Sequence, residues 1–356
     1  MTSRKLLRTL IDYEEEAQNI LNEPVRSFYY SGAEYGKAHR RNIKALQKIY
    51  LCPNICVDVS ERDTSANFLG YSIPIPLGIS PTAQHKHANF EGELATARAA
   101  AYHNTPYVMS LFSNISVRQV IHAVPGVKIL IQLQFMKDRD ILSKLLNQFI
   151  NDGVKGICLT LDIPIINPTK PGLLSLASKY SIPNIPTELR EKTKTSLTLF
   201  DNDHITWEDV AWFISKSTVP VIVKGVLSPK NALEAINIGA AGIWISNHGG
   251  RQLADAPPTI EALRVIAPLA KKAKIPLYID GGIRSGGDIL KCLALGADIV
   301  FLGRPIISGL VVGGYKGVVD TLNIIKRDFE ANMAMCGFKN VKEINEKCLW
   351  ENISKI

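Results

Sequence analysis

Eight short apolar runs alternate with amphipathic segments from about residue 74 onward, and this alternation limits the possible folds more than any other feature. Runs of Val, Ile and Leu separated by segments of helical period predict parallel strands joined by crossover helices. Eight such units predict an α/β fold, a (β/α)8 TIM barrel, with an open doubly wound sheet as the alternative. The expected strands are 75–80, 107–110, 128–134, 156–162, 220–225, 242–247, 276–281 and 299–303, and the expected helices are 91–102, 137–151, 207–217, 229–238, 258–270 and 287–295.

Two segments fall outside the repeating units. Residues 1–73 contain helical stretches at 6–21 and 25–30, and we expect them to pack on the barrel as an N-terminal helical segment. Residues 163–205 follow the fourth strand and are interrupted by prolines, so we interpret them as an active-site lid loop. Residues 74–356 then form the barrel, with one domain overall.

Charge and composition narrow the class of protein. The net charge is +8, but the basic residues are scattered, which argues against a nucleic-acid partner. The six cysteines form no C-x-x-C pair, which favours free thiols, and no metal is expected. No apolar stretch reaches the roughly 18 residues of a membrane helix.

The chain ends in Ser354-Lys355-Ile356, close to the Ser-Lys-Leu tripeptide of peroxisomal import. We therefore expect the import receptor as a partner and a peroxisomal, otherwise cytoplasmic, location.

Polar residues occur at the carboxyl end of nearly every expected strand. In a TIM barrel these ends form one mouth, where the active site lies. We therefore expect the following residues to lie together: Ser80 to Ala83, Ser110, Gln132, Gln134, Thr160, Asp162, Lys224, Ser246 to Arg251, Asp280 to Arg284, Gly303 and Arg304.

The segments after the last two strands predict a phosphate site. Asp280-Gly281-Gly282-Ile283-Arg284 and Gly303-Arg304 combine glycines, which let backbone N–H groups approach an anion, with arginines that neutralise it. The alternative is that they are ordinary turn glycines with surface arginines.

Four charged residues are the candidate catalytic groups. His248 is a candidate proton acceptor, and Arg251 a candidate carboxylate binder. Asp162 is placed to orient the imidazole, and Lys224 to stabilise negative charge on a bound ring. The alternatives are a core histidine and an ion pair between Lys224 and Asp162.

With these residues in order, the chain resembles the FMN-dependent (S)-2-hydroxy-acid oxidases, the glycolate oxidase and hydroxyacid oxidase family, over nearly its full length. The most specific matches are Ser246-Asn-His-Gly-Gly-Arg-Gln-Leu253 and Asp280-Gly-Gly-Ile-Arg284. Further matches are Ser31-Gly-Ala-Glu34, Pro81-Thr-Ala83, Glu91-Gly-Glu93, Leu159-Thr-Leu-Asp162, Val223-Lys-Gly225 and Leu293-Ala-Leu-Gly296.

The resemblance implies a role for each matching position. FMN would be held by Pro81, Thr82, Ala83, Ser110, Gln132, Thr160, Lys224 and Ser246, with its phosphate at Asp280, Gly281, Gly282, Ile283, Arg284, Gly303 and Arg304. His248 would be the base, supported by Asp162, while Arg251 grips the substrate carboxylate and Lys224 stabilises reduced flavin. Dioxygen would reoxidise the flavin, giving a 2-oxo acid and hydrogen peroxide. Members of the family are commonly homo-oligomers, tetramers or octamers, and often peroxisomal.

Four positions depart from the short-chain members of that family. Phe28 and Phe112 replace a Tyr and a Trp, which favours medium or long aliphatic substrates. Gln134 replaces a second active-site Tyr, and Thr169 aligns with a lid Arg that binds the carboxylate. Two lost polar contacts motivate an alternative, a catalytically impaired flavin-binding module. A further alternative is a dehydrogenase of the same family that uses an acceptor other than dioxygen.

Overall fold

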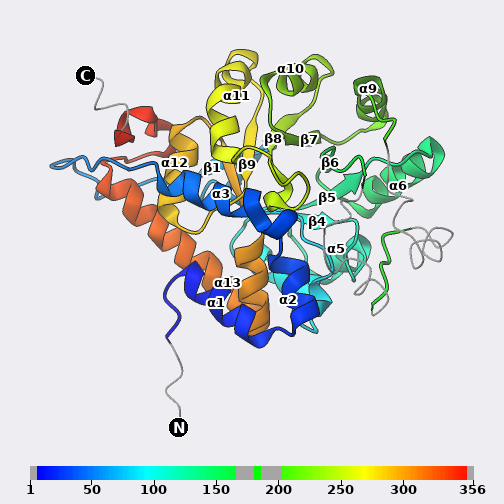
Figure 1. Cartoon of the computed structure of the whole chain (residues 1–356), viewed down its shortest axis with the longest axis horizontal. Coiled ribbons are helices and arrows are strands. Elements are labelled where there is room, and N and C mark those ends of the chain that lie inside the picture. The colour runs from blue at the N-terminus through cyan, green and yellow to red at the C-terminus, as the bar shows by residue number, and fades with distance from the viewer. Residues whose placement is uncertain (1–5, 166–179, 186–202, 351–356) are drawn as a thin grey trace, which may run out of the picture.

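The computed structural model describes residues 6–165, 180–185 and 203–350, and its centre is a closed parallel barrel (Figure 1). The strand order is β10-β3-β4-β5-β6-β7-β8-β9, so each strand pairs with its neighbour along the chain and the last closes on the first. All eight strands expected from the sequence are confirmed: β3 (Leu77–Ile79), β4 (Tyr107–Ser110), β5 (Ile129–Gln134), β6 (Ile157–Thr160), β7 (Val221–Val226), β8 (Gly242–Ile245), β9 (Leu277–Asp280) and β10 (Ile299–Leu302).

Helices surround the barrel, and the six expected crossover helices are present. Several begin at a residue whose side chain accepts from the first helical turn, as Thr206, Ser228 and Ser285 do. Two helices around the barrel, α5 and α13, were not predicted from the sequence, and neither was the N-terminal helix Lys37–Gln47. The helices are α4 (Glu93–Tyr102), α5 (Val117–Ala123), α6 (Arg139–Asp152), α9 (Trp207–Lys216), α10 (Pro229–Asn237), α11 (Thr259–Ala273), α12 (Gly286–Ala294) and α13 (Arg304–Met335).

The N-terminal helices lie against the barrel at its functional end. α1 (Leu10–Ile20) runs beside the long α13, and α2 (Glu23–Tyr30) and α3 (Lys37–Gln47) follow it (Figure 1). α3 contacts the short turn of 3-10 helix His248–Gly250, where a Cβ on Gly250 would lie 2.2 Å from the backbone nitrogen of His39. Only glycine permits this approach, so α3 is seated directly on the segment that carries His248.

Along the chain, a two-stranded hairpin lies between α3 and β3, in a segment expected from the sequence to be helical. It consists of β1 (Ala66–Phe68) and β2 (Tyr71–Ile73), whose strands are too short for a periodic signal. Phe68 is fully buried, with ring centroids 5.4 Å from Tyr278 and 5.8 Å from Phe301. The hairpin therefore covers an apolar layer inside the barrel. Within the described residues, no helix is long and apolar enough to cross a membrane.

Candidate active site

A cavity opens at the carboxyl ends of the barrel strands, as the fold predicts. Of the candidate cofactor, substrate and catalytic residues, all line this cavity except Asp162 and Ser246, which lie directly behind it. The lining residues from that set are Phe28, Pro81, Thr82, Ala83, Ser110, Phe112, Gln132, Gln134, Thr160, Lys224, His248, Arg251, Asp280, Gly281, Gly282, Ile283, Arg284, Gly303 and Arg304.

His248 and Asp162 form a hydrogen-bonded pair. The Nδ1 atom of His248 lies 3.1 Å from Oδ1 of Asp162, and the backbone N–H of His248 donates to Oγ of Ser246 at 3.0 Å. Gly225 makes room for the carboxylate, because a Cβ there would lie 2.7 Å from the Cβ of Asp162. Since a carboxylate only accepts, the pair favours the tautomer with the proton on Nδ1 and the basic lone pair on Nε2.

Lys224 is a buried cation that forms an ion pair with Asp280. Its Nζ lies 3.3 Å from Oδ2 of Asp280 and donates to Oγ of Ser246 at 2.7 Å, while that hydroxyl donates to Oδ1 of Asp280 at 2.6 Å. Burial opposes the charge, but the carboxylates of Asp280 and Asp162 hold the pKa of Lys224 above its usual value. A permanent positive charge is therefore fixed on the cavity wall.

Arg251 and Arg304 are both held by the backbone at the C-terminal end of α2. Arg251 donates to the carbonyls of Tyr29 at 3.4 Å and Ser31 at 3.3 Å, and its guanidinium lies 5.6 Å from the ring centre of Phe28. Arg304 donates to the same two carbonyls, at 3.1 and 3.0 Å. Burial lowers the pKa of Arg251 to about 10, and burial together with Arg251 and Arg284 lowers that of Arg304 to about 9, so both stay charged at neutral pH.

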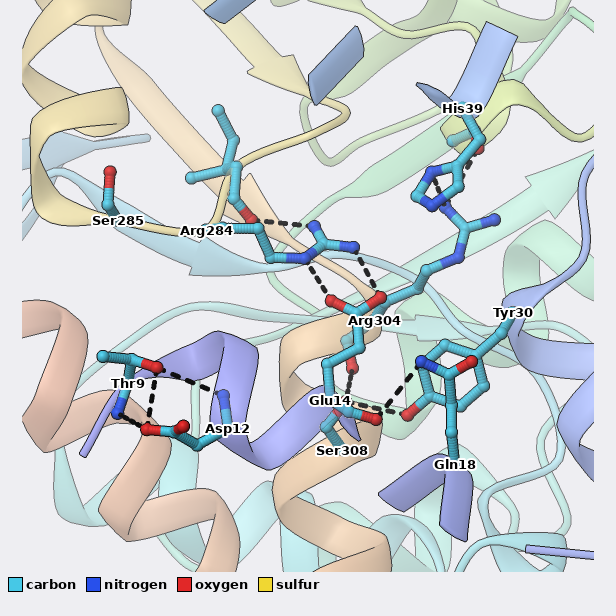
Figure 2. A network of polar contacts seen from close by, with 12 residues as sticks. Thr9, Asp12, Glu14, Gln18, Tyr30, His39, Arg284, Ser285, Arg304 and Ser308 are labelled. Atoms are coloured by element: carbon cyan, nitrogen blue, oxygen red, sulfur yellow. Dashed lines mark hydrogen bonds and ion pairs between the residues drawn. The ribbon is translucent and has the colours of Figure 1, made fainter. Parts of the chain in front are cut away.

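Arg284 is paired with Glu14 from the N-terminal helix (Figure 2). Its Nη2 donates to Oε1 of Glu14 at 3.0 Å, and its Nε donates to the other carboxylate oxygen. Arg251, Arg284 and Arg304 place three positive charges at the cavity wall. The carboxylate of Glu14 offsets only one of them. Such a wall attracts anions.

The cavity also contains a backbone loop suited to a phosphate and a further polar group suited to another part of a ligand. Gly281 and Gly282 have φ values of +107° and +86°, which turn the backbone sharply beside Arg284 and suit an anion-binding loop. Oγ1 of Thr160 is buried with no hydrogen-bond partner among the described residues, which marks a position where a polar ligand atom belongs. These observations fit a nucleotide such as FMN.

The sequence profile of one protein family, the FMN-dependent dehydrogenases, matches residues 17–351. The chain belongs to this family. It is 35% identical to human 2-hydroxyacid oxidase 1 over 97% of this chain and 98% of that one, and 37% identical to rice glycolate oxidase 2 over 95% of both. A peroxisomal (S)-2-hydroxyacid oxidase of Arabidopsis thaliana is 35% identical over 94% of this chain and 93% of its own.

Solved structures confirm the fold of this family member. An active chimera of (S)-mandelate dehydrogenase matches with a TM-score of 0.89 at 30% identity, covering 97% of this chain and 99% of that one. The flavin-binding domain of baker's yeast flavocytochrome b2 matches with a TM-score of 0.87 at 30% identity, covering 96% of this chain and 86% of that one. FMN is the cofactor of the family, and the cavity residues fit it.

Some functional contacts were not predicted from the sequence, and some predictions lie outside the described residues. The sequence offered no signal for Glu14, because its partner Arg284 is far away along the chain. His85 follows the Pro81-Thr-Ala83 motif closely, and extending that motif would have found it.

Of the lid, residues 163–165, 180–185 and 203–205 are described, and Ile163 and Ile182 line the cavity. Thr169 and the terminal Ser354-Lys355-Ile356 lie outside the described residues.

Proposed function

We propose that this family member oxidises (S)-2-hydroxy acids to 2-oxo acids, with dioxygen reduced to hydrogen peroxide. The observation that carries the proposal is the His248–Asp162 pair, at 3.1 Å, beside Arg251 in a cavity whose wall also holds the buried cation Lys224. A base, a carboxylate binder and a fixed positive charge are the groups that this oxidation requires.

Each residue has a distinct role in this mechanism. Arg251 holds the substrate carboxylate, and Nε2 of His248 takes up the proton that the substrate loses, from the 2-hydroxyl or from C2. Asp162 stabilises the resulting imidazolium through Nδ1. Lys224 offsets negative charge that develops on the bound ring. FMN, when bound, supplies the acceptor for the two electrons.

The proposed substrates are medium- or long-chain aliphatic acids. Phe28, Phe112, Ile163 and Ile182 line the cavity with apolar surface, which favours an aliphatic chain over a short polar one. Gln134 donates from Nε2 to the carbonyl of Ile163 at 3.3 Å, so this amide contacts the beginning of the lid segment. An amide is a hydrogen-bond donor but not a proton shuttle, which keeps the impaired flavin-binding module as the second candidate.

The decisive experiment adds a panel of short- to long-chain (S)-2-hydroxy acids to the FMN-loaded protein under anaerobic conditions and follows the visible spectrum. Bleaching by the longer acids is the expected result, and the fastest bleaching identifies the preferred chain length. His248→Ala is expected to slow bleaching by about 10²- to 10⁴-fold while FMN stays bound. A protein that stays yellow with every acid would instead favour the flavin-binding module.

The electron acceptor is tested separately. Oxygen uptake and peroxide release during turnover are expected from an oxidase. A protein that bleaches with substrate but recolours only with an artificial acceptor would be a dehydrogenase, the activity named in its structural relative (S)-mandelate dehydrogenase.

We further propose peroxisomal import through Ser354-Lys355-Ile356 and assembly into a homo-oligomer. The first is supported by a relative named as peroxisomal and is checked by the location of a fluorescent fusion with and without the tripeptide. Light scattering of the purified protein measures the second.

A further inference from the structure

One wall of the cavity is a tight turn between β3 and a short helix, η2 (His85–His87). Pro81, Thr82, Ala83 and Gln84 of this turn all line the cavity. Gln84 has a φ of +59°, a conformation that costs free energy for a residue other than glycine. Its carbonyl accepts from the Tyr29 hydroxyl at 2.6 Å. The turn is thus held in an unfavourable conformation by buried contacts.

His85 supplies the most direct of these contacts, and it lies behind the turn rather than in the cavity. The residue is completely buried, with Nε2 2.5 Å from Oγ1 of Thr82 and Nδ1 3.0 Å from Oγ1 of Thr96 in α4. Burial lowers the pKa of His85 to about 3, so the ring is neutral at physiological pH. A neutral imidazole donates from one nitrogen and accepts at the other, so both hydroxyls are satisfied together.

Glu93 fixes the backbone at the same position. Its Oε1 accepts from the backbone N–H groups of His85 and Asn114, each at 3.0 Å. Glu93 is the first residue of α4 and is fully buried. The imidazole is therefore held from both its backbone and its ring, as a rigid support for Thr82.

We propose that His85 is a positioning residue, which acts through the side chain of Thr82 to hold the turn Pro81–Ala83 in the conformation that receives FMN. The hydroxyl of Thr82 is engaged by His85, so in this proposal the turn meets the cofactor through its backbone. The proposal rests on FMN as the cofactor and not on the identity of the substrate.

Two substitutions distinguish hydrogen bonding by His85 from a contribution that its side chain makes by packing alone. A leucine at position 85 preserves most of the apolar contact but removes the partner of the Thr82 hydroxyl and leaves the buried Thr96 hydroxyl without it. A glutamine preserves one donor and one acceptor. If hydrogen bonding to Thr82 is what matters, glutamine rescues and leucine does not.

The test is a double-mutant cycle on FMN binding, with His85→Leu, Thr82→Val and the double variant. The dissociation constant is measured by quenching of FMN fluorescence during reconstitution, without substrate. Each single variant is expected to bind FMN about 10- to 100-fold more weakly, and the double variant no more weakly than the worse single one. His85→Gln is expected to stay within about threefold of the wild type.

The control is His103→Leu, at the residue that follows α4, away from the cavity lining. It removes a half-buried imidazole and is expected to leave FMN affinity unchanged. Should His85→Leu fail to fold, Thr82→Val and Thr82→Ser test the same hydrogen bond, with loss expected for valine and retention for serine.

The proposal would be overturned if the losses of FMN affinity in the two single variants multiplied in the double variant. It would also be overturned if His85→Gln and His85→Leu lost equal affinity, or if His85→Leu kept the wild-type affinity. Because FMN affinity is measured without substrate, failure of hydroxy-acid oxidation leaves this test unaffected.

Discussion

Lys224 is a charged residue whose ion-pair partner, Asp280, lines the same cavity. Its side chain is 4% exposed and that of Asp280 is 10% exposed, so neither charge is screened by water. Ser246 joins the two through its hydroxyl. At the residue scale, the ammonium of Lys224 is held by Asp280 in β9 and by Ser246, which directly follows β8. The position of each of these side chains depends on the other two.

Removing one charge of this pair should cost more than removing both. We expect Asp280→Asn to lower the free energy of unfolding by about 3 to 5 kcal/mol, because it leaves the ammonium of Lys224 buried without its counter-charge. The double variant Asp280→Asn/Lys224→Met should recover part of this loss. Urea denaturation measures both, and simple additivity of the two substitutions would contradict the expectation.

His85 should make the protein sensitive to acid. Above about pH 6.5 the ring is neutral in both the folded and the unfolded state. Below that, the unfolded chain binds a proton that the folded protein excludes down to its pKa of about 3, so stability falls as pH falls. The expected slope is about 1.4 kcal/mol per pH unit from this group.

The variant His85→Gln should lack this component of the pH dependence. Urea midpoints of both proteins, compared between about pH 4 and about pH 7, are expected to converge as the pH falls. Parallel curves would show that His85 is protonated in the folded protein as readily as in the unfolded chain.

The N-terminal helix α1 matters at the scale of elements, because it carries a charge into the cofactor end of the barrel. Glu14 meets Arg284 there, and both side chains are largely buried, at 15% and 9% exposure (Figure 2). Asp12 forms a capping box with Thr9 that fixes where the helix begins. The helix is therefore positioned by its own cap, by α13 and by an arginine of the barrel.

We expect Glu14→Gln to destabilise the FMN-free protein by about 3 kcal/mol, since Arg284 loses its partner while Arg304 stays nearby. FMN, which brings a phosphate, should reduce this difference. Thermal denaturation with and without FMN measures both effects, and Glu15→Gln, at an exposed position of the same helix, is the matched control. An equal loss in the presence and absence of FMN would contradict a role at the phosphate site.

At the scale of the whole molecule, the cavity collects groups from the N-terminal helices and from the strands and loops of the barrel. The barrel strands contribute Lys224, Thr160 and Gln132, while the N-terminal segment contributes Phe28 and the carbonyls that hold both arginines. A ligand that bridges these parts stabilises the folded state by linkage. We therefore expect folding stability to depend on cofactor loading.

Riboflavin provides the comparison, because it lacks the phosphate. At about 1,000 times its dissociation constant, FMN should add about 4 kcal/mol to the free energy of unfolding. Riboflavin at the same concentration should add much less, because Arg284 and Arg304 have no anion to bind. Thermal shift assays measure the two, and equal shifts would contradict the assignment of the arginines to the phosphate.

The sequence by itself determined the barrel and most of its mouth. Period and spacing placed all eight strands, because a strand buried on both faces is an unbroken apolar run. Most of the polar residues that end those runs line one cavity, because parallel strands in a barrel end on the same side. These features depend on residues that are close together in the sequence, and they recur with each strand-helix unit.

Only the tertiary structure decided which charges meet. Lys224 pairs with Asp280 rather than forming the Asp162 ion pair considered from the sequence, and Arg284 pairs with Glu14 from the other end of the chain. His85 and Thr82 are neighbours in sequence, but only the burial of His85 makes their contact structurally important. The physical reason is that the strength of a charge pair or hydrogen bond depends on the distance between its atoms and on their burial. Closure of the barrel sets both quantities, and the local periodicity of the sequence does not encode them.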